Sequence, residues 1–417
     1  MRFLYNIFIH IYILALNLIS PFNKKVKTML KGEKECFDRL QNLNSEDKVA
    51  WFHCASLGEF EQGRPLIEEV KKQFPEYKIL LSFYSPSGYE SKKDYALADY
   101  VVYLPNDTKS NAKKFVKKVN PDLIFFIKYE FWYNYISALK GRRLFQVSLI
   151  LRQNQYFFSW YGKWFAKQLK NFEHFFVQNQ QTATLLNKIG YKNVTISGDT
   201  RFDRVMTIAN NAKSFTEIEK FCEGNQKIIL AGSSWLADEK IIQQAVKNLD
   251  IKLIIAPHVV GENHINEIQQ LFPEAILYSE LANNDKKSNI LIINCIGILS
   301  NLYQYCDIAY IGGGFGVGIH NTLEAATFGK PICFGTNYHK FQEAIDLINL
   351  KAAYSISNQE ELKQVLETLL NNEKIYNQSA EASKDYVKTK IGACKKIIVI
   401  LFSQKEKRLF LAFFLFI

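Results

Sequence analysis

Two glutamates follow apolar runs that have the composition of buried strands. Glu59 comes after Val49–His53 and the segment Ser56–Gly58, where the glycine permits a tight turn, and Glu130 comes after Leu123–Ile127. A carboxylate at the carboxyl end of a parallel strand can remove a proton from an attacking hydroxyl, so both glutamates are candidate catalytic residues. A helix-capping glutamate or a surface acid occupies the same kind of position, and spacing alone leaves these alternatives open.

A glycine-rich stretch at 311–335, IGGGFGVGIHNTLEAATFGKPICFG, supplies a second group of candidates. It combines a strand that ends in glycines, a histidine and an asparagine, and a helix that begins near Thr322 with a glutamate in its first turn. Glycines let the backbone approach a ligand closely, and the free N–H groups of a helix start attract phosphate. The stretch therefore predicts a nucleotide-sugar pocket. Its candidate binding residues are Gly313, Gly314, His320, Asn321 and Glu324.

Further binding candidates share a position after a predicted strand. Besides Ser56 and Gly58 they are Ser85, Arg152, Gly232, Ser233, Ser234 and His258. Serines followed by a helix start suit a phosphate, although an ordinary turn with a serine cap has the same sequence, and a solvated arginine is as common as a binding one. The sequence has no Asp-x-Asp motif and no His/Cys cluster with metal-ligand spacing, so we expect no catalytic metal and no cofactor besides the donor substrate.

Short apolar runs alternate with helical patterns, such as the one predicted at Glu61–Gln73, from residue 49 to about 356. This alternation of strands and helices would position the candidate residues. The predicted strands of the first half are Val49–His53, Ile79–Tyr84, Tyr100–Leu104, Leu123–Ile127, Leu144–Leu149, Phe175–Gln178 and Val194–Ser197. Those of the second half are Ile228–Ala231, Leu253–Ala256, Ile276–Tyr278, Ile290–Ile293, Ile308–Ile311 and Ile332–Phe334. Several are apolar throughout, as in parallel strands covered on both faces. We therefore predict an α/β protein with two doubly wound, Rossmann-like domains facing a cleft, at 33–205 and 206–395.

Composition limits the class of protein and the kind of partner. Apolar residues make up 48% of the 417, which excludes a disordered chain. The net charge of +11 favours an anionic partner, and because the lysines are spread along the chain we expect phosphates and a membrane surface, not nucleic acid. The seven cysteines are scattered without a C-x-x-C pair, which predicts reduced thiols in the cytoplasm.

Segment 1–23 predicts a membrane anchor. Between Phe3 and Asn23 there is no charged residue, and Lys24, Lys25 and Lys27 follow directly, which places the body of the protein on the cytoplasmic side. A helix that lies on the membrane instead of crossing it is the alternative. The segment 396–417 forms an apolar tail whose last part is too short to span a bilayer.

Eight motifs occur in an order that points to one family. They are HCASLGE (53–59), RPLIEEV (64–70), SPSGY (85–89), YLPND (103–107), YEFWYN (129–134), GDTRFD (198–203), AGSSW (231–235) and HNTLEAATFGKPICFG (320–335). With this collinear set, over roughly residues 1–390, the chain resembles the 3-deoxy-D-manno-octulosonic acid (Kdo) transferase family.

The resemblance implies an inverting, metal-independent glycosyltransferase with the GT-B fold, at the inner membrane. Such an enzyme moves Kdo from CMP-Kdo to a phosphorylated lipid A precursor (lipid IVA) in lipopolysaccharide synthesis. In the family pattern Glu59 matches the general base, Glu130 a second acidic position on the acceptor side, and Glu324 the ribose partner within the CMP-binding region.

Three motifs depart from the family pattern. Pro257–His258–Val259 replaces the usual Arg-His-Pro, GIHNTLEAA replaces GGHNPLEPA, and KYEFW (128–132) replaces the TEL-type acidic motif. Other GT-B enzymes, namely a UDP-sugar glycosyltransferase or a nucleotide-sugar epimerase, and a non-catalytic membrane scaffold of the same fold are the alternatives.

Overall fold

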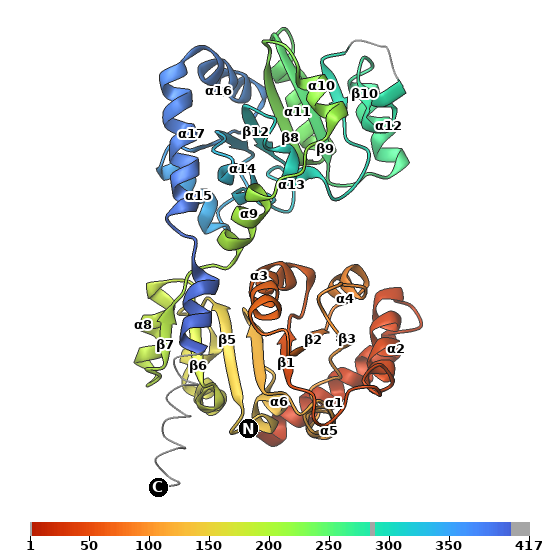
Figure 1. The fold of residues 1–417 in the computed structure, drawn as a ribbon, viewed down its shortest axis with the longest axis vertical. Helices are drawn as coiled ribbons and strands as arrows, with labels where there is room; N and C mark the ends of the chain where they lie inside the picture. The colour runs from red at the N-terminus through yellow and green to blue at the C-terminus, as the bar shows by residue number, and fades with distance from the viewer. Residues whose placement is uncertain (1, 284–287, 402–417) are drawn as a thin grey trace. The chain divides into compact units, whose positions relative to one another are not determined.

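The computed structural model describes residues 2–283 and 288–401, which form two compact units (Figure 1). The N-terminal unit comprises the chain up to Arg204 together with the residues from Gly392, and the C-terminal unit is Val205–Ile391. The first boundary lies one residue from the predicted one. The chain returns to the N-terminal unit at Gly392, whereas the sequence placed 392–395 in the second domain. Most of the predicted apolar tail, 402–417, lies outside the described residues.

The N-terminal unit is built on one sheet of seven parallel strands in the order β3-β2-β1-β4-β5-β6-β7. The strands are β1 (Val49–His53), β2 (Lys78–Phe83), β3 (Tyr100–Tyr103), β4 (Leu123–Ile127), β5 (Arg143–Leu149), β6 (His174–Val177) and β7 (Val194–Ile196). The connecting helices are α3 (Leu57–Gln73), α4 (Pro86–Lys92), α5 (Lys109–Val119), α6 (Tyr133–Ala138), α7 (Lys163–Ala166) and α8 (Gln180–Lys188). The boundary between the two units falls within α9 (Arg201–Asn210). All seven predicted strands are confirmed to within a residue at either end.

Both faces of this sheet are buried, which explains why its strands are apolar without alternation. Along β1, Val49 and Trp51 belong to one core cluster, and Ala50 and Phe52 belong to another. Successive side chains of a strand point to opposite faces, so the two clusters lie on the two sides of the sheet.

The C-terminal unit repeats this architecture with seven parallel strands in the order β10-β11-β9-β8-β12-β13-β14. They are β8 (Lys227–Ser234), β9 (Ile251–Pro257), β10 (Ile276–Leu277), β11 (Ile290–Ile292), β12 (Ile308–Ile311), β13 (Ile332–Phe334) and β14 (Ala353–Ser355). The helices are α10 (Thr216–Cys222), α11 (Leu236–Val246), α12 (Glu262–Leu271), α13 (Leu299–Leu302), α14 (Leu323–Thr327), α15 (Gln342–Asn349), α16 (Gln359–Asn371) and α17 (Glu373–Lys388). The six predicted strands are confirmed, and the short edge strand β14 was not predicted.

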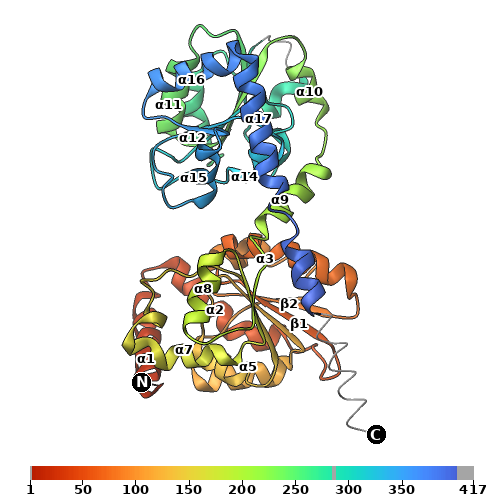
Figure 2. The same ribbon diagram turned by 90° about the vertical axis from the view of Figure 1, so that its left-hand side faces the viewer.

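Two helices precede the first strand, α1 (Arg2–Ile19) and α2 (Lys24–Arg39), and they pack against each other (Figure 2). Helix α1 is long and apolar enough to cross a membrane. Its first turns are nevertheless bonded to the N-terminal unit: the Tyr5 hydroxyl donates to Asp107 Oδ2 at 2.6 Å, and Asn134 Nδ2 donates to Asn6 Oδ1 at 2.9 Å. One side of α1 is therefore fixed against the body of the unit.

The return of the chain at Gly392 is held by one carboxylate. Asp203 accepts from the backbone nitrogens of Gly392 and Cys394, at 2.5 and 2.7 Å. The turn of chain that follows buries Ile397 and Ile398 in the core of the N-terminal unit. Residues near both ends of the chain thus complete the same unit.

Candidate active site

Each sheet has one place where the strand order reverses. In the N-terminal unit β1 pairs with both β2 and β4, and in the C-terminal unit β8 pairs with both β9 and β12. In open parallel sheets, ligands bind at the carboxyl ends of the strands that flank this point, because the connections leave it to opposite faces. The relevant loops therefore follow β1, β4, β8 and β12, and most of the predicted site residues lie in or beside them. Ser85, Arg152 and His258 instead follow β2, β5 and β9.

Glu59 lies in the first turn of α3. The helix begins at Leu57, four residues before the start at 61 that the sequence predicted. Its Oε2 accepts from the backbone nitrogen of Ser56 at 3.0 Å and from the Ser56 hydroxyl at 3.3 Å. The capping role considered as an alternative is thus present. Oε1 has no hydrogen-bond partner within the described part of the chain, so capping leaves that oxygen available for a substrate.

The electrostatic setting makes Glu59 basic near neutral pH. Burial, and secondly the negative charge of Glu130, raise the pKa of Glu59 from 4.5 to about 7, against the opposing effects of the Ser56 hydrogen bonds and the Lys128 cation. A general base works best when its pKa lies near the working pH. The two predicted catalytic glutamates therefore act on one another.

Glu130 is buried, with 6% of its surface exposed, so the alternative of a solvated surface acid does not apply. His53 Nε2 lies 3.0 Å from Glu130 Oε2, and Trp132 Nε1 donates to the same oxygen. The chain reaches this position through Lys128, whose φ of 68° makes the sharp turn at the end of β4. His53, the last residue of β1, is thus joined to Glu130.

Gly58 lies within the first turn of α3 and has no left-handed φ, so its backbone conformation is open to other residues. Its part in substrate binding stays a prediction. A Cβ at this position would meet no atom within 4 Å. Gly58 leaves open space beside Glu59.

Two other predicted residues lie in neighbouring loops of the N-terminal unit. Ser85 caps α4 and accepts from the Ser87 nitrogen at 3.3 Å, as in the turn considered for it. Arg152 is exposed after β5. The pKa of Tyr129 is raised by burial, while Arg152 lowers it and Glu59 raises it, so these two charges flank one tyrosine.

The loop after β8 is held by buried acids that the sequence did not single out. Asp238 Oδ2 accepts from the backbone nitrogens of Trp235 and Gly313, both at 2.9 Å, and Oδ1 accepts from the Tyr310 hydroxyl at 2.8 Å. The Ser234 hydroxyl donates to Glu239 Oε1 at 2.8 Å. These bonds tie the loops after β8 and β12 together and engage the Ser234 hydroxyl predicted to bind phosphate.

Glycines at the ends of β8 and β12 permit close packing. A Cβ on Gly232 would lie 2.2 Å from the Tyr303 hydroxyl, and one on Gly314 would lie 2.5 Å from the Gly335 nitrogen. Gly313 has a φ of 91° and would place a Cβ 2.4 Å from the Gly318 carbonyl oxygen. Ser233, between Gly232 and Ser234, has a φ of 53° where the register with β9 shifts. The glycines are thus explained by the fold of the loop itself.

Three aromatic rings stack beside this loop. The His258 ring centroid lies 4.8 Å from that of Trp235 and 4.3 Å from that of His320, and Trp235 Nε1 donates to His320 Nε2 at 3.1 Å. Burial and the neighbouring His258 lower the pKa of His320 to about 4, so the ring is neutral at physiological pH. Trp235 remains 37% exposed and can receive a further planar group.

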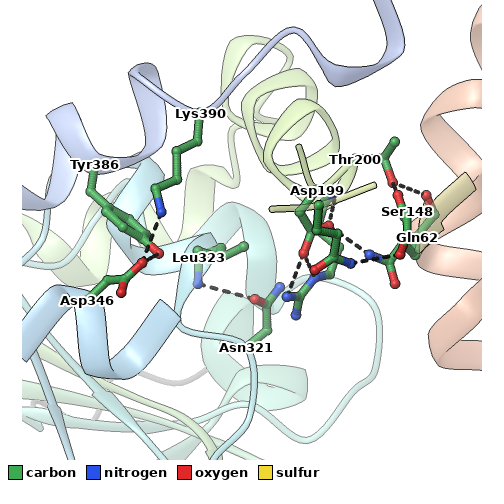
Figure 3. A network of polar contacts seen from close by, with 11 residues as sticks. Gln62, Ser148, Asp199, Thr200, Asn321, Leu323, Asp346, Tyr386 and Lys390 are labelled. Carbon is green, nitrogen blue, oxygen red and sulfur yellow. Dashed lines mark hydrogen bonds and ion pairs between the residues drawn. The ribbon is translucent and has the colours of Figure 1, made fainter. Parts of the chain in front are cut away.

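Asn321 and Glu324 lie where the sequence placed them, at the start of α14. Asn321 Nδ2 donates to Glu324 Oε1 at 3.0 Å. Asn321 Oδ1 accepts from the Leu323 nitrogen at 3.2 Å (Figure 3). The helix is a single short turn of five residues. Its side chains, more than its dipole, therefore define this edge of the site.

Comparison with known proteins agrees with this geometry. Residues 32–204 match the family model described as 3-deoxy-D-manno-octulosonic-acid transferase (kdotransferase). A 3-deoxy-D-manno-octulosonic acid transferase of Rickettsia bellii is 29% identical, over 87% of this chain and 89% of that protein. The enzyme of the same name from Chlamydia trachomatis serovar D is 25% identical, over 87% of each chain.

A longer relative and two solved structures extend the comparison. A bifunctional glycosyltransferase/methyltransferase of Fusobacterium nucleatum is 28% identical, and the match covers 86% of this chain but 58% of that protein. A UDP-N-acetylglucosamine 2-epimerase superposes with a TM-score of 0.58 at 16% identity, over 87% of this chain and 98% of that one. Anabaena HepE in complex with UDP superposes with a TM-score of 0.54 at 14% identity, over 86% and 100%. At these identities the solved structures establish the fold alone.

The two seven-stranded parallel sheets have the GT-B architecture. The family model and the named relatives support a glycosyltransferase. Residues 32–204 carry the Kdo transferase domain, and Kdo transferases are similar to this protein over most of its length.

Proposed function

We propose that this protein transfers Kdo from CMP-Kdo to a hydroxyl of a phosphorylated lipid A precursor, with inversion and without a metal. Glu59 is the observation that carries the proposal. Its carboxylate stands at the switch point of the N-terminal sheet, beside open space at Gly58, with a pKa of about 7. The choice of Kdo as the transferred sugar is based on the names of the family model and of the relatives.

In this mechanism the acceptor hydroxyl attacks the anomeric carbon of Kdo while its proton passes to Glu59. The bond from that carbon to the CMP phosphate breaks, and CMP leaves with the electron pair. Glu130 acts beside Glu59 by raising its basicity through negative charge. General-base catalysis of this kind contributes about 10²- to 10⁴-fold.

We assign the donor nucleotide to the C-terminal unit. The stacked rings of Trp235, His258 and His320 offer a face for the cytosine base, and Glu324 is placed to accept from ribose hydroxyls. Because His320 is neutral, the ring stack adds no charge to this face. Binding of CMP, compared with UDP, tests this assignment by calorimetry.

The decisive test is incubation of the purified protein with CMP-Kdo and lipid A precursor, with the product read by mass. A mass increase of one or more Kdo units supports the proposal, and an unchanged acceptor together with intact donor contradicts it. Parallel incubation with UDP-sugars tests the other GT-B activities.

We further propose that α1 lies in the membrane interface instead of crossing the bilayer. Tyr5, Asn6 and Tyr12 bond to the N-terminal unit, the last through Tyr84 at 3.1 Å, so that side of α1 is not available to lipid. The opposite side exposes apolar residues. They are Phe3, Leu4, Ile7, Phe8, Ile11, Leu14, Leu18 and Ile19. The lysines at the start of α2 add attraction to an anionic surface.

Fluorophores attached at Leu4→Cys and Leu18→Cys distinguish the two arrangements. At 1.5 Å per residue the sites are about 21 Å apart along the helix. Brominated-lipid quenching in anionic vesicles should place both at one shallow depth, whereas a depth difference near the full separation would show a spanning helix.

A further inference from the structure

A chain of buried hydrogen bonds crosses three adjacent strands of the N-terminal sheet and ends on Glu130. Trp51 Nε1, on β1, donates to the Ser82 hydroxyl on β2 at 2.7 Å. The Ser82 hydroxyl lies 2.9 Å from His53 Nδ1, and His53 Nε2 lies 3.0 Å from Glu130 Oε2. His53 and Ser82 are direct partners in the strand register, so the sheet itself sets these distances.

The donor groups in this series of hydrogen bonds indicate which atom donates and which accepts at each step. An indole nitrogen can only donate, so the Ser82 oxygen accepts from Trp51 and has its own proton to offer to His53 Nδ1. With Nδ1 accepting from Ser82, the imidazole N–H that remains is at Nε2, where it points at Glu130. The competing tautomer would donate from Nδ1 to the Ser82 carbonyl, which is farther at 3.2 Å and already accepts from the Cys54 nitrogen.

The surrounding residues exclude water from this series of hydrogen bonds. Trp51, His53 and Ser82 are all fully buried. The rings of Phe126 and Trp132 meet the imidazole edge-on, with centroids 5.5 and 5.7 Å away. In such a setting a fixed donor strongly favours the ionised form of the carboxyl that it faces.

We propose that His53 is a positioning residue that holds the side chain of Glu130 in place beside Glu59. The Trp51–Ser82 pair fixes the imidazole tautomer, and His53 and Trp132 donate to one oxygen of Glu130, so its charge is held close to Glu59. The catalytic importance of His53 rests on the proposed function. Its effect on the pKa of Glu59 can be measured without the reaction.

Several titratable groups bear on Glu59 besides Glu130. They are Lys128, Cys54, Tyr129 and, across Tyr129, Arg152. None of them contacts His53 through a hydrogen bond within the described residues. A change at His53 therefore reaches Glu59 through Glu130.

The test is the titration of Glu59, followed by the ¹³C signal of its carboxyl carbon in the full-length protein and assigned by its loss in Glu59→Gln. In His53→Leu, Glu130 loses the donor that holds its side chain in place and can turn away, so less negative charge faces Glu59. The pKa of Glu59 should fall by about one unit, because a like charge nearby is what this change removes. The acid limb of the transfer rate should move to lower pH by the same amount, with a lower plateau rate.

Two further variants separate positioning from packing. His53→Gln retains an N–H donor towards Glu130 and should recover more than half of the shift. Ser82→Ala keeps the imidazole but frees its tautomer, and should shift Glu59 in the same direction by less. Thermal unfolding checks that each variant is folded; if His53→Leu is not, Ser82→Ala decides.

An unchanged Glu59 titration in the folded variants would overturn the inference, and so would loss of activity with an unmoved acid limb, which is the signature of a purely structural role. The titration needs no turnover. If the wild-type protein forms no Kdo product while the titration shifts as expected, the proposed function fails and the role of His53 stands.

Discussion

In the N-terminal unit, the loops after β1 and β4 bring Glu59 and Glu130 to the switch point of the sheet. In the C-terminal unit, the equivalent loops after β8 and β12 bring Trp235 and the glycines at 312–314. Both sheets have seven parallel strands and reverse their order at one place. The same topology thus presents acids in one unit and a bare backbone with aromatic rings in the other.

This difference separates what a fold decides from what side chains decide. Topology selects the edge of each sheet where a ligand can bind, because only there do connections depart to opposite faces. The chemistry at that edge is set by the residues that follow each strand. In the N-terminal unit these are carboxylates that can accept a proton, and in the C-terminal unit they are glycines and aromatic rings that can receive a planar group. Each of the following experiments acts on one unit and uses the other as its reference.

The largest effect is expected for Glu59→Gln. An amide cannot accept the proton of the acceptor, so we expect transfer to fall by about 10²- to 10⁴-fold, measured as the initial rate of product formation. Affinity for CMP should stay the same, since the nucleotide is assigned to the C-terminal unit. Glu61→Gln, on the same helix, is the matched control, and a rate near wild type for Glu59→Gln would reject the general base.

The pH dependence of the wild-type rate should come next in size. Since Glu59 has a pKa of about 7 and acts in its ionised form, kcat/KM should fall about tenfold for each pH unit below that value. CMP binding should not follow this curve, because the pKa of His320 is about 4. A rate that is flat between pH 5.5 and roughly 7 would be incompatible with Glu59 as the base.

A pair of glycine variants compares the two units in stability. Gly314→Ala forces a Cβ against the backbone of Gly335, and we expect it to lower the free energy of unfolding by about 1–3 kcal/mol. Gly58→Ala meets open space in a helix and should raise the free energy of unfolding by about 0.5–1 kcal/mol. Urea unfolding of both variants measures the difference in the free energy of unfolding. Equal effects would contradict the expectation that Gly314, and not Gly58, is required for close packing.

The smallest effect is expected for Trp235→Ala. Loss of one stacking face should weaken CMP binding by roughly two- to tenfold, the range for a single aromatic pair. Calorimetric titration gives the dissociation constant. Trp132→Phe, in the other unit, should leave that constant unchanged, and an equal loss in both would contradict the assignment of the nucleotide to the ring stack.

Most of the fold follows from local sequence. Strands such as Leu123–Ile127 are buried on both faces and read as unbroken apolar runs, so periodicity and length identify them. The edge strand β14 has three residues, of which only Ala353 is fully buried, and so short a segment has no such signal. The helix α3 begins earlier than expected because Ser56 and Glu59 close its first turn together.

The sequence predicted where the candidate site residues lie, but not which residues they form hydrogen bonds with. Glu59 and Glu130 both follow strands, and parallel strands bring such residues to one edge. That Glu130 is buried against His53, 77 positions earlier in the chain, depends on the register of three strands and cannot be read from spacing. Asp238 was missed for the same reason, because its partners at Tyr310 and Gly313 lie on another strand end.

The chain's return to the N-terminal unit at Gly392 has a consequence for biosynthesis. Asp203 and the core around Ile397 and Ile398 need residues that leave the ribosome only after the whole of Val205–Ile391 has been made. At 5–20 residues per second that interval is roughly ten to forty seconds, during which an apolar surface of the first unit is uncovered. The nascent protein therefore passes through a stage in which its second unit is complete and its first is not, so a fragment ending near Arg204 is expected to be short-lived in the cell.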